Sequence, residues 1–171
     1  NAMWYEVPQS RQRVFFIGIR KDLGIEPSFP EPMKKVITAA EAIKGAETSD
    51  CGKPRVLLAE KMKSVKNGSN IARTFKINSL FSYVRCPINK PAMTLQKSVT
   101  HGGITMYHPK ENRNLSTGEL KRICSFPDEY KMEGKYAEIV NRLGNAVMPK
   151  MMYHIAKHIK ENILNKGKDN G

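Results

Sequence analysis

The sequence predicts an α+β fold in which short strands and helices follow one another along the chain. Residues 13–19 contain an apolar run, and apolar side chains on both faces indicate a strand buried inside a sheet. From Leu80 to Cys86 bulky side chains recur at every second position, which is typical of a half-buried strand. Ser116 and Glu119 fit a capping box, so a helix is expected to begin there.

Cap and turn residues set the bounds of the remaining predicted elements. Thr38 and Glu41 fit a capping box, and Gly45 ends that helix. The helix after Ser116 ends before Pro127, because the residue that precedes a proline disfavours helical backbone. The other expected elements are a helix over 57–65, a strand over 92–96, a helix over 134–143 and a last helix from Pro149.

The predicted strand over 13–19 and the last helix both carry apolar side chains that the rest of this sequence is too short to cover. The helix carries a stripe formed by Met152, Ile155, Ile159 and Ile163, and the chain is too short to supply a full sheet for the strand. We therefore expect these two elements to pair with each other or to support a dimer.

Composition limits the kinds of partner and environment that the chain is expected to have. The 171 residues carry a formal net charge of +13 and a pI near 9.8, which favours a polyanionic partner. Much of the excess lies in 61–76 and after Lys150. No apolar run of this sequence is long enough for a membrane span, and we expect no secretory signal. Three scattered cysteines favour reduced thiols in a cytoplasmic protein, and we expect no metal, because His154 and His158 have no third ligand nearby.

The segment from Gln9 to Arg13 holds the strongest chemical signal. Arg11 and Arg13 are two residues apart, and alternate residues of an extended chain point the same way. The spacing predicts that both guanidiniums face one place, with Gln9 beside them. Such fork-shaped donors suit a phosphate or the edge of a base.

This segment resembles the Gln-x-Arg-x-Arg motif of the DNA (cytosine-5-)-methyltransferases. Three further segments agree in the order that the family has. Residues 90–95 resemble the Thr-Leu dipeptide of the target recognition region, 112–130 resemble the ninth motif, and 144–149 resemble the tenth. Four matches in one order, over nearly the whole chain, favour the family strongly.

Other motifs of the family are missing from the sequence. It contains no Gly-rich S-adenosylmethionine loop, no Glu-Asn-Val segment, and no cysteine that follows a proline, as the nucleophile does. The resemblance therefore implies the carboxyl-terminal portion: part of a Rossmann-like methyltransferase domain plus a small mixed target recognition domain. Residues 1–25 would be a catalytic-domain strand segment, 26–130 the recognition region with the ninth motif, and 131–171 the tenth motif and returning helix.

The resemblance also implies roles for single residues. Arg13 would bond the O2 atom of a cytosine flipped out of the duplex, and Arg11 and Gln9 would hold the backbone around it. Thr94 would touch a phosphate near the flipped nucleotide, with Leu95 packed beneath. The plainer alternatives are ordinary salt bridges for the arginines and core packing for the Thr-Leu pair.

The tenth motif implies a contact with the cofactor. Asn145, Ala146 and Val147 would line one wall of the S-adenosylmethionine pocket, most of which would lie outside this chain. A plain loop between two helices is the alternative, because Gly-Asn is a common turn. Residues 126–130, Phe-Pro-Asp-Glu-Tyr, are expected to be structural.

The expected whole enzyme transfers a methyl group from S-adenosylmethionine to C5 of cytosine in a specific sequence of double-stranded DNA. It would serve restriction–modification in a bacterial cytoplasm, near the nucleoid. Its partner would be a missing N-terminal catalytic half, on the same or a separate polypeptide. A split-enzyme subunit, an inactive DNA-binding module and a tRNA substrate remain alternatives. Residues 46–108 would set the recognition sequence, which one sequence does not reveal.

Overall fold

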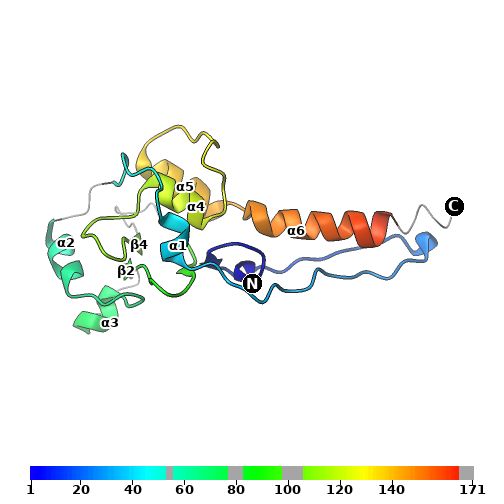
Figure 1. The fold of residues 1–171 in the computed structure, drawn as a ribbon, viewed down its shortest axis with the longest axis horizontal. Helices are drawn as coiled ribbons and strands as arrows, with labels where there is room; N and C mark the ends of the chain where they lie inside the picture. The colour runs from blue at the N-terminus through cyan, green and yellow to red at the C-terminus, as the bar shows by residue number, and fades with distance from the viewer. Residues whose placement is uncertain (53–55, 77–82, 98–105, 166–171) are drawn as a thin grey trace.

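The computed structural model of the protein describes residues 1–52, 56–76, 83–97 and 106–165. A compact lobe at one end carries most of the helices, and a long arm extends from it (Figure 1). The elements, in chain order, are η1 (Ala2–Trp4), β1 (Gln9–Ser10), η2 (Lys21–Leu23), α1 (Ala39–Ile43), α2 (Val56–Lys63), α3 (Ile71–Phe75), β2 (Val84–Arg85), β3 (Ala92–Met93), β4 (Met106–Tyr107), α4 (Thr117–Ile123), α5 (Tyr136–Asn145), α6 (Pro149–Ile159) and the π-helical turn η4 (Lys160–Leu164).

The strands form two small parallel pairs. β1 pairs with β3, with Gln9 opposite Ala92, and β2 pairs with β4, with Val84 opposite Met106. The β1–β3 pair ties the amino-terminal segment to the middle of the chain, and the β2–β4 pair joins two segments within the middle. The mixed α+β character predicted from the sequence is confirmed over the described residues.

Three helices, α1, α4 and α6, begin where the cap residues predict. The helix expected over 134–143 is instead Tyr136–Asn145, and no predicted element covers α3 (Ile71–Phe75). Ser116 Oγ accepts a hydrogen bond from Glu119 N at 3.0 Å, and Glu119 Oε2 accepts one from Ser116 N at 2.7 Å. Leu115 and Leu120, on either side of this cap, are both buried. The box at Thr38 is also formed, and Pro149 occupies the first turn of α6.

Two hydrophobic clusters hold the lobe together. The larger one joins α1, α4, α5 and the start of α6, with Leu95 and Leu143 among its fully buried members. The smaller one contains Met62, Val65, Ile71 and Tyr107, with Tyr83 packed against it. The second cluster lies under α2 and α3, apart from the segments that carry the four motifs.

Residues 13–19 do not form the predicted strand. They are extended but pair with no described strand, and Val14 and Phe16 are 79% and 93% exposed. The reason is the missing sheet: an apolar run forms a ladder only where a second strand offers its backbone groups. The strands expected over 80–86 and 92–96 are also shorter, with only Val84–Arg85 and Ala92–Met93 paired; residues 80–82 lie outside the described residues.

The extended arm instead lies along α6 (Figure 1). Phe15 packs at the edge of the larger cluster, and it lines a hollow of about 270 Å³ with Met151 and Ile155 of α6. Farther along, Ser28 Oγ and His158 Nε2 are hydrogen-bonded at 2.8 Å. The expected pairing of these two elements is met only in part, because Phe15 lies beside Met151 and Ile155 while Val14 and Phe16 stay exposed.

The apolar stripe of α6 differs by one position from the prediction. Met151 is 2% exposed, Ile155 and Ile163 are also buried, and Met152 is 37% exposed. The arm and the lobe both approach the helix on the side of Met151, which sets the buried face. Among the described residues, no helix is long and apolar enough to cross a membrane.

Candidate functional site

The Arg11 guanidinium joins three of the four motif segments. Its Nη1 donates to the carbonyl of Leu95 at 3.0 Å, and its Nη2 donates to the carbonyls of Gly144 at 2.8 Å and Ala146 at 3.4 Å. The residue is 2% exposed. One buried fork therefore fixes the position of the Gln-x-Arg-x-Arg segment against the Thr-Leu dipeptide and the tenth motif.

We call the contacts of Arg11 with Leu95, Gly144 and Ala146 the Arg11 joint, and Gln9 extends it toward the ninth motif. Its side chain is fully buried, accepts a hydrogen bond from Leu95 N at 3.2 Å and donates to Cys124 Sγ at 3.5 Å. Beside it, Thr94 Oγ1 donates to the carbonyl of Ser10 at 2.7 Å. The four segments that the sequence singled out thus meet at one place.

Arg13 lies on the other side of the same segment. It is exposed, it donates to the neighbouring Gln12 carbonyl at 2.6 Å, and it forms no ion pair with a described side chain. It lines two open hollows beside Asn1, one of them with Phe15. The prediction that both guanidiniums face one place is wrong, because the paired strand ends at Ser10 and Arg11 turns inward to unpaired carbonyls.

Burial shapes the electrostatics of the joint. Burial lowers the pKa of the Arg11 guanidinium from its ordinary value, and the nearby charge of Arg13 acts in the same direction. Burial also raises the pKa of Cys86 and Cys124 to about 12 and raises that of Cys51. A nucleophilic cysteine needs a lowered pKa, so none of the three thiols of the chain has that character.

The end of α5, where the tenth motif starts, packs closely on the segment after β3. A Cβ atom at Gly144 would stand 2.8 Å from the backbone of Gln96, so only glycine fits this approach. Asn145 is the last residue of α5 and is exposed, and the side chain of Val147 is 53% exposed. Arg11 holds the carbonyls of this turn from inside, and the exposed side chains form an outward-facing wall.

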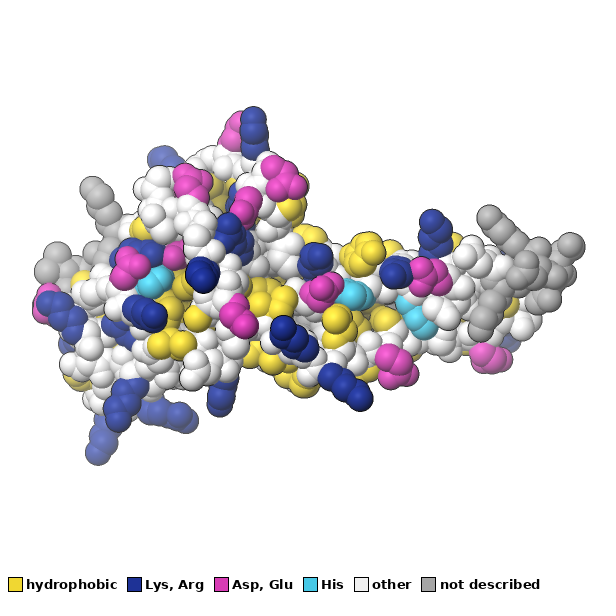
Figure 2. All heavy atoms as spheres, in the orientation of Figure 1, with side chains coloured by type: hydrophobic (Ala, Val, Ile, Leu, Met, Phe, Trp, Pro, Cys, Tyr) yellow, Lys and Arg dark blue, Asp and Glu magenta, His cyan; other side chains and the backbone are white. Residues whose placement is uncertain are grey.

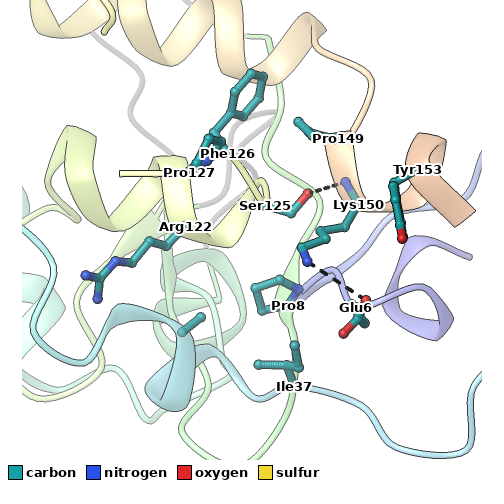
Figure 3. Close-up of a pocket in the computed structure, with 11 residues that line it drawn as sticks. Glu6, Pro8, Ile37, Arg122, Ser125, Phe126, Pro127, Pro149, Lys150 and Tyr153 are labelled. Atoms are coloured by element: carbon teal, nitrogen blue, oxygen red, sulfur yellow. Dashed lines mark hydrogen bonds and ion pairs between the residues drawn. The ribbon is translucent and has the colours of Figure 1, made fainter. Parts of the chain in front are cut away.

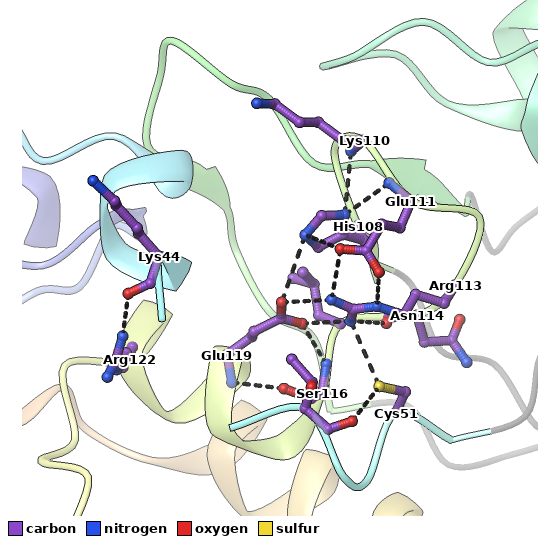
Figure 4. A network of polar contacts seen from close by, with 12 residues as sticks. Lys44, Cys51, His108, Lys110, Glu111, Arg113, Asn114, Ser116, Glu119 and Arg122 are labelled. Carbon is purple, nitrogen blue, oxygen red and sulfur yellow. Dashed lines mark hydrogen bonds and ion pairs between the residues drawn. The ribbon is translucent and has the colours of Figure 1, made fainter. Parts of the chain in front are cut away.

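The ninth motif forms a buried polar network (Figure 4). Arg113 donates to both carboxylate oxygens of Glu119, at 2.8 and 2.9 Å. Burial alone would raise the pKa of Glu119, but hydrogen bonds from Arg113 and from the Ser116 backbone bring it below its ordinary value. His108 lies beside Glu119, and burial lowers the pKa of its imidazole. The network holds α4 against the loop after β4, a structural role for the ninth motif.

A hollow that the sequence did not indicate lies where β1, α4 and α6 approach one another (Figure 3). Its volume is about 500 Å³, and Pro8, Phe126 and Tyr153 supply apolar walls. At its rim, Lys150 Nζ lies 4.0 Å from Glu6 Oε2. Among the described residues, no group of three or more His, Cys, Asp or Glu side chains could hold a metal ion.

The sequence is similar to known DNA methyltransferases over nearly its whole length. Residues 1–161 match the family of C-5 cytosine-specific DNA methylases. The chain is 31% identical to the Type II methyltransferase M.PspPI of Psychrobacter sp., covering 93% of this chain and 44% of that protein. It is 30% identical to the Type II methyltransferase M.MthTI of Methanothermobacter thermautotrophicus, covering 95% and 55%.

The fold has a counterpart among solved structures. A prophage-encoded protein of E. coli, assigned as a DNA modification methyltransferase, superposes with a TM-score of 0.72 at 19% identity. The match covers 96% of this chain and 58% of that one, and at this identity it concerns the fold alone.

The chain belongs to the C-5 cytosine-specific DNA methylase family, whose methyl donor is S-adenosylmethionine. It spans about half the length of the curated relatives that it matches, 44% and 55% for the two above.

Proposed function

We propose that this chain is the target-recognition and carboxyl-terminal part of a DNA (cytosine-5-)-methyltransferase that acts on a specific sequence of double-stranded DNA at the bacterial nucleoid. The observation that carries the proposal is the Arg11 joint. It ties three motif segments together from inside and leaves Arg13 exposed on the same short segment.

Arg13 is the residue that meets the flipped cytosine in this proposal. Its exposure and its freedom from ion pairs with described side chains leave the guanidinium available to a ligand. A donor at the cytosine O2 would also offset negative charge that develops on the ring as C6 is attacked. The thiolate that attacks would come from outside this chain.

Arg11 and Gln9 are positioning residues here, because both are buried and act through the backbone that they hold. Thr94 has one hydroxyl proton, which it donates to the Ser10 carbonyl. A phosphate accepts hydrogen bonds only, so a Thr94 contact with DNA requires this hydroxyl to rotate away from Ser10.

Asn145, Ala146 and Val147 form one wall of the cofactor site in this proposal. The exposed side chains of Asn145 and Val147, on a turn held from inside by Arg11, fit a wall and not an enclosed pocket. S-adenosylmethionine supplies the methyl group when it is bound there. The rest of its site would belong to the missing N-terminal half.

The exposed run at 14–19 is the proposed attachment to that half. Its unpaired backbone and the exposed Val14 and Phe16 fit a strand that completes a partner sheet. Whether the half lies on the same polypeptide or on a separate subunit does not change this attachment. An inactive DNA-binding module is the second candidate, favoured by the three thiols of raised pKa.

Transfer of tritium from labelled S-adenosylmethionine tests the proposal. The chain alone should transfer no label to duplex DNA, and the protein completed by a catalytic half should label cytosine in duplex DNA but not in tRNA. Label transferred by the chain alone would overturn the assignment of the missing parts. A completed protein that binds DNA without transferring label would favour the inactive module.

A further inference from the structure

A basic hollow lies between the end of α2 and the loop after β4, away from the Arg11 joint. Its volume is about 310 Å³. Its polar lining consists of Lys63, Asn67, Arg85, Lys110 and Asn112, and no carboxylate of a described residue lines it. The described walls therefore offer ammonium and amide donors, which suit an anion that only accepts hydrogen bonds.

Arg85 assembles this hollow from inside. Its buried guanidinium donates to the carbonyls of Val65 at 2.9 Å, His108 at 3.0 Å and Glu111 at 3.1 Å, and also to the carbonyl of Met62. It therefore binds the end of α2 to the loop after β4. By donating to the Met62 and Val65 carbonyls, Arg85 also neutralises the partial negative charge at the end of α2, which would otherwise repel an anion.

The backbone beneath Lys110 is held in place as well. His108 Nδ1 accepts hydrogen bonds from the backbone N–H groups of Lys110 at 3.2 Å and of Glu111 at 2.8 Å (Figure 4). The Glu111 carboxylate is engaged by Arg113 Nε at 2.7 Å. Lys63 and Lys110 thus reach one hollow from two elements whose relative position is fixed.

The surroundings of the hollow are strongly positive. Residues 61–76 contain five Lys or Arg and no Asp or Glu. Lys63 is paired with Glu60 at 2.7 Å, but both side chains are more than half exposed, so the pair is weak and can exchange. Lys110 forms no ion pair with a described residue. Figure 2 shows Lys and Arg side chains projecting over this end of the lobe.

We propose that this hollow binds one phosphate group of the DNA backbone. The inference rests on the proposed function for the choice of DNA as the partner. Lys63 and Lys110 supply the charge, and Asn67 and Asn112 supply neutral donors beside it. A contact of this kind sets the register of the recognition lobe on the duplex and carries no sequence information.

Salt dependence of duplex binding by the 171-residue chain tests the proposal. Fluorescence anisotropy gives the slope of log K against log salt for two unrelated short duplexes. The Lys63→Gln/Lys110→Gln variant should lower that slope by about 1 and weaken binding by roughly 10-fold at 0.1 M salt, equally for both duplexes. Both lysines are exposed, so the variant should keep the circular dichroism spectrum of the parent.

The matched control is Lys157→Gln/Lys160→Gln, which removes two exposed charges from α6 and η4, away from the hollow. An unchanged slope in the first variant, an equal drop in the control, or no duplex binding by the parent chain would overturn the proposal. Inorganic phosphate, added at constant ionic strength, distinguishes a free-anion site. If it shifts the Lys110 amide resonance while the slope stays unchanged in the variant, the hollow binds free phosphate and the DNA assignment is wrong. The methyl-transfer assay remains separate, so a lowered slope without transfer would refute only the proposed function.

Discussion

Replacement of Arg11 by methionine should destabilise the chain severely, although the same change at Arg13 should not. Arg11→Met keeps a long apolar side chain but removes the donors to the carbonyls of Leu95 and Gly144. Hydrogen bonds from a charged donor contribute about 1.5–3 kcal/mol each, so two of them give about 3–6 kcal/mol. Relief of a desolvated charge, and of an Arg11 Nε atom that has no hydrogen-bond partner, offsets part of this loss.

The expected loss is therefore about 3 kcal/mol, a large share of the roughly 5–15 kcal/mol that stabilises a typical domain. Urea denaturation followed by circular dichroism measures it as a change in the free energy of unfolding. Arg13→Met is the matched control and should stay within about 0.5 kcal/mol of the parent, because its side chain is exposed. Equal losses in the two variants would refute the assignment of Arg11 as the joint.

Three further changes test other parts of the structure. Gly144→Ala should cost about 1–3 kcal/mol of unfolding free energy in the same assay, because its Cβ would meet backbone atoms at 2.8 Å. Burial lowers the pKa of His108 in the folded chain below its unfolded value, so the unfolded state binds more protons. The free energy of unfolding should therefore fall as the pH drops below about 6.5. The His108→Gln variant should show a weaker dependence on pH. A thiol reagent should label Cys51 before the two buried cysteines; equal labelling of all three in the folded chain would contradict their burial.

Local signals were sufficient to predict three helix starts, but they did not predict α3. The capping boxes at Thr38 and Ser116 and the proline at the start of α6 mark starts that the structure confirms. Each of these signals depends on hydrogen bonds or backbone angles within one helical turn, so contacts with distant segments rarely move the helix start.

Contacts between distant segments decided what the sequence did not predict. The two carbonyls that draw Arg11 inward lie 84 and 133 residues away, so no local pattern shows which arginine is buried. The run at 14–19 has the composition of a strand but no sheet to join. The basic hollow depends on Arg85, whose partners lie on two separate segments. Its sequence signal, the positive charge over 61–76, was visible, but its geometry was not.

Turnover by an Arg13→Ala variant of the completed methyltransferase tests the central claim most directly. If Arg13 meets the flipped base, kcat should fall by about 100-fold or more while the Kd for duplex DNA stays within about 3-fold, because the donor is used only when the base is extruded. Equal losses in kcat and in affinity would show that Arg13 is only a backbone contact. An unchanged kcat would remove it from the site.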